Sequence, residues 1–145
     1  MNESNSWGEI LESGSTPHKL AILHQIRNSP PPSESITLKI IELIREGAVI
    51  DIKVSAIHTL GHIKNKKAIP VLLEIVKKLD ETVEVIVQAV ESLVDMSASE
   101  AEEIFYEYRY AEKVHPTIRS SCLWAYERLK NFPLPERKGD LSELK

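Results

Sequence analysis

Apolar residues recur along this chain in a ten-residue pattern that appears four times. The copies begin at His18, Ile52, Val85 and Ile118, so the spacings are 34, 33 and 33 residues. Positions +4, +5 and +8 of each copy are mostly apolar: Ile22, Leu23 and Ile26; Ala56, Ile57 and Leu60; Ala89, Val90 and Leu93; Cys122, Leu123 and Tyr126. A fixed period in the thirties is typical of two-helix units, which stack because none can bury its apolar face alone.

The spacing of apolar residues, prolines and glycines predicts eight helices. We expect them at about 6–12, 16–28, 34–46, 51–64, 67–79, 82–96, from Ser97 or Ser99 onward, and 116–130. The stretch from Val83 to Val94 is rich in β-branched residues, which favour strands. We nevertheless interpret it as a helix, because it is too long for a strand and keeps the phase of the copies on both sides.

Taken in pairs, these helices predict one repeat domain and a tail. The domain covers residues 1–131, with repeats at about 5–29, 34–64, 67–96 and 99–130. Residues 132–145 contain two prolines, one glycine and six charged residues, which is typical of a C-terminal tail.

The second copy carries a resemblance to a known family. Residues 52–63 read IKVSAIHTLGHI, and residues 68–72 read AIPVL. Together they resemble the HEAT repeat in its bacterial phycobilisome-lyase form, roughly V-R-x-x-A-A-x-A-L-G-x-I followed by A-I-P-x-L. Residues 118–126, IRSSCLWAY, resemble it in part. The resemblance implies an all-α fold, a right-handed α-solenoid of about four helix pairs whose second helices line a concave surface. It implies no single chemistry.

Composition narrows the class of function. The formal net charge of −4 argues against a general nucleic-acid binder, which needs a positive field. No stretch approaches the roughly 20 apolar residues of a membrane-spanning helix. A single cysteine, Cys122, excludes an internal disulfide and occupies an apolar position, so we expect a buried thiol in a protein of the cytoplasm.

One side of each second helix is predicted to stay free. At about 100° per residue, positions +2, +3, +6 and +10 lie opposite the apolar positions. We therefore expect a partner-binding concave face made of Leu20, His24, Val54, Ser55, His58, His62, Val87, Gln88, Glu91, Asp95, Ser121, Trp124 and Arg128. Trp124 and Arg128, one turn apart, are residue types that often anchor interfaces. On the other side, Tyr106 and Tyr110 could form a second, convex contact.

These features favour a non-catalytic scaffold or adaptor that binds a protein or peptide in a concave groove, as a monomer or weak dimer. No nucleophile constellation, phosphate loop or dinucleotide fingerprint is present, and no cofactor is expected. One alternative, implied by the resemblance alone, is an accessory subunit of a bilin lyase or isomerase.

A second alternative is a metal-binding, hydroxylase-like protein. His58 and His62 have the four-residue spacing of metal ligands on one helix, and His24 occupies the same row on a neighbouring helix. The adjacent histidine–glutamate pairs of HEAT-like di-iron hydroxylases are missing, however, so these three histidines remain candidate ligands without a complete motif.

Overall fold

The structure is a computed structural model that describes residues 3–130. This part of the chain is entirely helical: α1(Glu3–Ser13), α2(Thr16–Arg27), α3(Glu34–Arg45), α4(Ile50–Ile63), the 3-10 helix η1(Lys66–Ala68), α5(Ile69–Lys78), α6(Val83–Asp95), the 3-10 helix η2(Ser99–Ala101), α7(Glu102–Tyr108) and α8(Pro116–Leu129). The expected all-α fold is confirmed, and the β-branched stretch forms α6 rather than a strand. The tail predicted at 132–145 lies outside the described residues.

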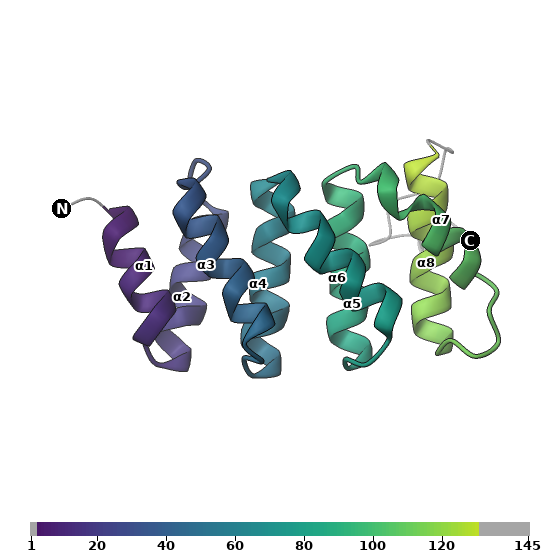
Figure 1. The fold of residues 1–145 in the computed structure, drawn as a ribbon, viewed down its shortest axis with the longest axis horizontal. Helices are drawn as coiled ribbons and strands as arrows, with labels where there is room; N and C mark the ends of the chain where they lie inside the picture. The colour runs from purple at the N-terminus through teal and green to yellow at the C-terminus, as the bar shows by residue number, and fades with distance from the viewer. Residues whose placement is uncertain (1–2, 131–145) are drawn as a thin grey trace, which may run out of the picture.

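The helices form two layers, which makes the fold an α-solenoid (Figure 1). The first helix of each pair, α1, α3, α5 or α7, packs on its own second helix. The second helices pack side by side in chain order, α2 on α4, α4 on α6 and α6 on α8. Among the first helices, α1 packs closely on α3, whereas α5 makes few contacts with α3 or α7. The first-helix layer is therefore the more open one.

Local sequence signals set the helix boundaries. The side chains of Ser33 and Thr82 accept hydrogen bonds from the amides three residues later, which caps α3 and α6. Gly47, with φ +79°, follows α3 in the left-handed conformation that glycine adopts most easily. Proline occupies the first turn of α5 at Pro70 and of α8 at Pro116, where no helical hydrogen bond is lost.

The core contains the positions that the period predicted. Positions 0, +4, +5 and +8 of the second and third copies are buried without exception: Ile52, Ala56, Ile57, Leu60, Val85, Ala89, Val90 and Leu93. The outer copies are less complete, because His18 is exposed and Tyr126 is half-buried. Cys122 is fully buried, as expected, and burial raises the pKa of its thiol to about 12. No helix in the described part of the chain is long and apolar enough to cross a membrane.

Hydroxyl groups at position +7 link neighbouring second helices. Ser92 Oγ of α6 donates a hydrogen bond to the Ile57 carbonyl of α4 at 2.9 Å. Thr59 Oγ1 of α4 lies 2.7 Å from the Ser55 carbonyl of its own helix and 3.4 Å from the Leu23 carbonyl of α2. Both hydroxyls are fully buried. Position +7 lies on the same side of each helix as the apolar positions, and the second and third copies carry hydroxyl residues there. The hydroxyls supply directed contacts that fix how one helix sits on the next.

Candidate functional site

The predicted site lies on the outward side of α2, α4, α6 and α8, which we call the second-helix face. Three of its predicted residues are exposed: His24, His62 and Asp95. Nine are half-buried: Leu20, Val54, Ser55, His58, Val87, Gln88, Glu91, Trp124 and Arg128. Ser121 is fully buried, so the expectation that it lies on the solvent side is wrong. Position +3 is at the edge of the apolar half of the helix, and in α8 the residue at this position faces the core.

The apolar row of the second-helix face is less exposed than its spacing suggested. Leu20, Val54, Val87 and Trp124 are half-buried and pack against the core. Each still presents part of its surface, and together they cross all four helices. The guanidinium carbon of Arg128 lies 5.8 Å from the Trp124 ring centroid, within reach of a cation–π contact. This pair is the largest aromatic and cationic feature of the face.

Arg27, a residue that the repeat pattern does not single out, is the last residue of α2 and contacts α4 beside this face. Its Nη1 donates to Ser55 Oγ and to Thr59 Oγ1, each at 2.9 Å, so it joins α2 to α4. The hydroxyl of Ser55 is thus engaged within the fold. The signal for this contact in the sequence was the arginine at position +9 of the first copy, which lies beside two hydroxyl residues of the next second helix.

The histidines of the second-helix face do not converge. His58 and His62 are in edge contact, with ring centroids 4.9 Å apart. His24 is occupied on its own helix, where Nε2 lies 3.2 Å from Asn28 Nδ2 and Nδ1 lies 3.4 Å from Arg27 Nη2. Within residues 3–130, no three His, Cys, Asp or Glu side chains are grouped so that they could hold a metal ion. His24, His58 and His62, the candidate ligands of the metal-binding alternative, therefore do not form a metal site within residues 3–130.

Asp95 is an acidic residue of this face whose pKa is shifted by its surroundings. Desolvation raises the pKa of its carboxyl group, and the nearby charges of His62 and Lys64 oppose this shift. A carboxylate with a raised pKa near His62 is a polar feature of the kind found at functional sites. The centre of the second-helix face therefore combines acidic and imidazole groups, with Trp124 and Arg128 on the neighbouring helix.

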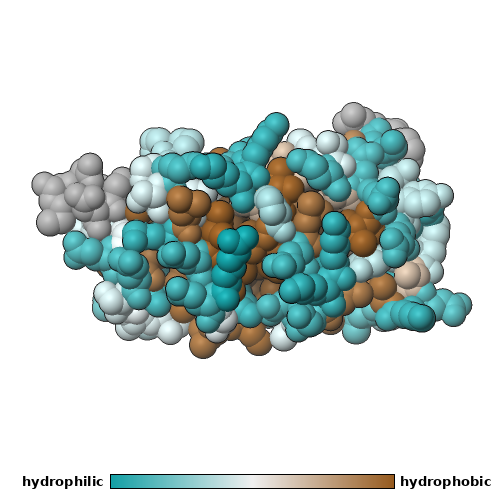
Figure 2. Space-filling model, viewed as in Figure 1, coloured by the Kyte–Doolittle hydropathy of each residue, from teal (hydrophilic) through white to brown (hydrophobic). Residues whose placement is uncertain are grey.

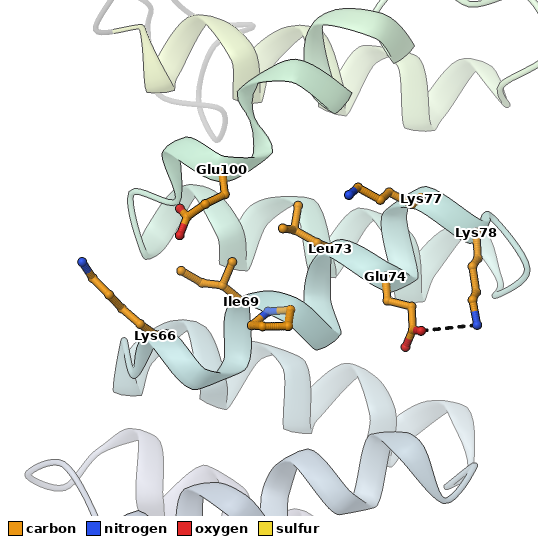
Figure 3. Close-up of a pocket in the computed structure, with 8 residues that line it drawn as sticks. Lys66, Ile69, Leu73, Glu74, Lys77, Lys78 and Glu100 are labelled. Carbon is orange, nitrogen blue, oxygen red and sulfur yellow. Dashed lines mark ion pairs between the residues drawn. The ribbon is translucent and has the colours of Figure 1, made fainter.

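The first-helix face carries cavities that the sequence did not predict. Figure 2 shows this face, with hydrophilic side chains over the helices and apolar side chains visible between α3, α5 and α7. A cavity of about 570 Å³ lies along α5 and is lined by Lys66, Ile69, Pro70, Leu73, Glu74, Lys77, Lys78 and Glu100. Ile69 and Leu73 point toward η2, and Lys66 and Lys77 stand at its two ends (Figure 3). The cavity is thus lined by apolar side chains together with three lysines and two glutamates, and Glu74 forms an ion pair with Lys78 at 3.4 Å.

A second cavity on the first-helix face, of about 430 Å³, is acidic and aromatic. It is lined by Ser99, Glu100, Glu102, Glu103, Tyr106 and Tyr126, so it shares Glu100 with the first. Tyr106 and Tyr110, the residues predicted as a second, convex contact, are both exposed. The dense run of glutamates and aromatics from residue 100 to 110 was the signal for this cavity, but the period alone could not show that η2 and α7 meet Tyr126 of α8 there.

Comparison with known proteins identifies the fold. No protein-family model matches this sequence. No curated protein matches it either. Among solved structures, the chain is similar to human deoxyhypusine hydroxylase in complex with glycerol, with a TM-score of 0.74 and 18% sequence identity. The match covers 92% of this chain and 47% of that protein, so the chain spans about half the length of the enzyme it resembles.

This similarity corrects two expectations. The prediction of a non-catalytic scaffold or adaptor, and with it the prediction that the chain is not an enzyme, is contradicted, because the solved structure reported above as similar to this chain is an enzyme. The finding agrees better with the hydroxylase-like alternative. The HEAT-like architecture is supported, whereas no family model supports the phycobilisome-lyase form of the repeat. At 18% identity, the similarity establishes the fold alone.

Proposed function

We propose that this chain is a hydroxylase-like α-solenoid unit whose second-helix face binds the polypeptide substrate of a hydroxylation reaction. The observation that carries the proposal is the similarity of 92% of the chain to deoxyhypusine hydroxylase. In this chain, the second helices of the fold carry a row of half-buried apolar side chains, Leu20, Val54, Val87 and Trp124, with polar side chains beside it. A cytoplasmic location belongs to this proposal and rests on the single cysteine.

Different residues of the second-helix face contact different groups of the bound polypeptide. Trp124 offers the largest apolar surface, and Arg128 one turn later offers a cation for substrate carboxylates or carbonyls. Asp95 and the two histidines of α4 supply acidic and imidazole groups that set the register of a bound segment. Because the described residues do not assemble a metal site, residues outside 3–130 or another chain would have to supply the oxidation chemistry.

The proposal is tested in the source organism by mass spectrometry. Peptides that carry one added oxygen are compared between wild-type cells and cells that lack the gene. We expect a defined set of hydroxylated peptides to disappear in the deletion strain and to return when the wild-type gene is restored. Trp124→Ala should fail to restore them fully, because losing an interface anchor weakens binding by about 2 kcal/mol, or roughly 30-fold.

Two control variants make the result specific. Arg128→Ala removes the second anchor and should also reduce hydroxylation, whereas Glu107→Gln changes an exposed side chain of α7, on the other layer, and should not. Far-UV circular dichroism of the purified variants shows that each one folds. The proposal fails if the hydroxylated peptides are the same with and without the gene.

A further inference from the structure

The last second helix, α8, leads directly from the second-helix face into the residues that follow it. Trp124 and Arg128, the two anchors of this face, lie in the last two turns of α8, which ends at Leu129. Residues 131–145 then read NFPLPERKGDLSELK. Because α8 tethers them beside the face, their effective concentration there is on the order of millimolar. Even a weakly complementary segment is therefore held on the face.

Residues 131–145 are long enough to cross from α8 to its neighbours. Ten extended residues span up to about 33 Å. Packed helices lie about 10 Å apart, and α8 packs on α6, which packs on α4. A segment of this length that starts at the end of α8 can therefore reach both helices.

The charges at this end of the second-helix face complement those of the segment. Asp95 and Arg128 occupy position +10 of their copies, so they lie at the same end of two adjacent helices, α6 and α8. Neither forms an ion pair with any residue between 3 and 130. In consecutive positions of the segment, Glu136 offers a carboxylate and Arg137 a guanidinium group. The segment thus supplies one charge of each sign for a face that carries one of each.

The segment also supplies apolar side chains for the half-buried row of the face. Val87 of α6 and Trp124 of α8 each keep part of their surface outside the core. Phe132 and Leu134 follow within five residues of the end of α8. Contact between the two sets removes apolar surface of both from water, and an apolar patch of this kind usually marks a contact site.

We propose that residues 131–145 bind to the second-helix face of the same molecule. The apolar residues of the segment cover Trp124 and Val87, and its charged residues pair with Arg128 and Asp95. This contact does not depend on any reaction. Its consequence, that the segment competes with a polypeptide substrate for the same face, rests on the function proposed above.

The test is paramagnetic relaxation enhancement in the full chain, isotope-labelled for amide NMR and carrying a nitroxide on Ser142→Cys. Cys122 is fully buried, so the nitroxide attaches to the introduced thiol. We expect the amides of α4, α6 and α8 to broaden more than those of α3, α5 and α7, which form the other layer. Equal broadening of the two layers, or stronger broadening of the first helices, would overturn the proposal.

A mixed sample separates contact within one molecule from contact between molecules. Isotope-labelled wild type, combined with unlabelled protein that carries the nitroxide, reports only contacts between molecules. We expect no selective broadening in this sample. Broadening of the second helices here would show that the segment binds a second copy, and a contact within one molecule would be wrong.

Variants show which side chains hold the segment. Leu134→Ser should lower the ratio of bound to unbound segment by about tenfold, because it removes apolar surface from the contact. Asp95→Lys should lower this ratio by about twofold to fivefold, as expected for an exposed ion pair, and Arg137→Glu in the same chain should restore it. Glu107→Lys, on α7, is the matched control for a charge reversal and should leave the ratio unchanged. An exchanged pair that does not restore binding, or a control with an equal effect, would contradict the proposed contact.

The competition with a substrate has its own measurement in the source organism. Leu134→Ser frees the second-helix face, so it should raise the level of hydroxylated peptides above the level that the wild-type gene restores. An unchanged level, where the peptides depend on the gene, would overturn the competition. Peptides that do not depend on the gene would overturn the proposed function, whereas the NMR measurement decides the contact by itself.

Discussion

Gly61 of α4 lies directly against Ser92 of α6. A β-carbon built on Gly61 would be 2.8 Å from Ser92 Oγ, 2.9 Å from its Cβ and 3.1 Å from its Cα. The Ser92 hydroxyl reaches the Ile57 carbonyl of α4 at 2.9 Å. The missing side chain at Gly61 therefore allows the close approach of α4 and α6 on which this buried hydrogen bond depends.

Replacing Gly61 with alanine should destabilise the protein. Alanine favours a helix over glycine by up to about 1 kcal/mol. The steric conflict with the backbone of Ser92 should outweigh this gain, because overpacking a tight contact typically costs about 1–3 kcal/mol. We expect a net loss in the free energy of unfolding, measured by urea denaturation.

Gly8 provides the matched control within α1. A β-carbon there would meet only the flexible end of the Lys39 side chain, at 3.2 and 3.5 Å, and the tip of Ile36 at 3.7 Å. Gly8→Ala should therefore be neutral or stabilise the protein by up to about 1 kcal/mol. If both alanine variants were equally stabilised, α4 and α6 would not be as close at Gly61 as the structure shows.

Arg27 should hold the first helix pair onto the rest of the solenoid. Arg27→Ala removes the hydrogen bonds to Ser55 and Thr59, and we expect a loss of about 1–3 kcal/mol in unfolding free energy. Hydrogen exchange should accelerate most in α1 and α2, because each pair of a solenoid is stabilised by its neighbour. Arg45→Ala, at an exposed position of α3, is the control and should change stability by less than about 1 kcal/mol.

The period of the sequence predicts the helices because each apolar position meets equivalent positions on the next helix. Ile57 and Val90, for example, occupy the same phase and are both fully buried. The helix at Val83–Asp95 is predictable for the same reason, although its residues favour strands locally. Stacking against neighbours on both sides outweighs that local preference.

Features that depend on how each helix is rotated, or on how far the first helices spread apart, do not follow from the period. Ser121 is at the edge of the apolar half of α8, where a small rotation decides between burial and exposure. The first cavity lies between α5 and η2, and the second lies between η2, α7 and Tyr126 of α8, so both depend on the spacing between η2 and its neighbouring helices. The conformation of the intervening turns determines this spacing, and a repeating apolar pattern does not specify it.

The thiol of Cys122 should be almost unreactive in the folded protein. It is fully buried, and its pKa of about 12 leaves little thiolate at neutral pH. Alkylation by iodoacetamide at pH 8 should be at least about 100-fold slower in the native state than in urea, by mass spectrometry. Rapid labelling of the native protein would show that Cys122 is accessible.

The same thiol should make stability fall with pH. Its folded pKa is above the unfolded value of about 8.5, so its contribution is fully present below pH 8.5 and is lost as pH rises toward 12. The urea midpoint of the wild type should decrease above pH 8.5 more steeply than that of Cys122→Ala. Parallel curves for the two proteins would contradict a raised pKa.

Tyr108 should fasten α7 to the end of α5. Its hydroxyl donates a hydrogen bond to the Lys77 carbonyl at 3.0 Å, and this carbonyl is in the last turn of α5, where no helical amide can reach it. Tyr108→Phe should lower the free energy of unfolding by about 1 kcal/mol, measured in urea, whereas Tyr106→Phe, at a side chain that is 53% exposed, should lower it by less than about 0.5 kcal/mol.

The phenol of Tyr108 should also make stability depend on pH. Its pKa is raised, chiefly by desolvation, so the contribution of the neutral phenol to stability is present below pH 10 and is lost as pH rises through the folded pKa. Equal stability of the two phenylalanine variants would show that the hydroxyl of Tyr108 does not stabilise the end of α5.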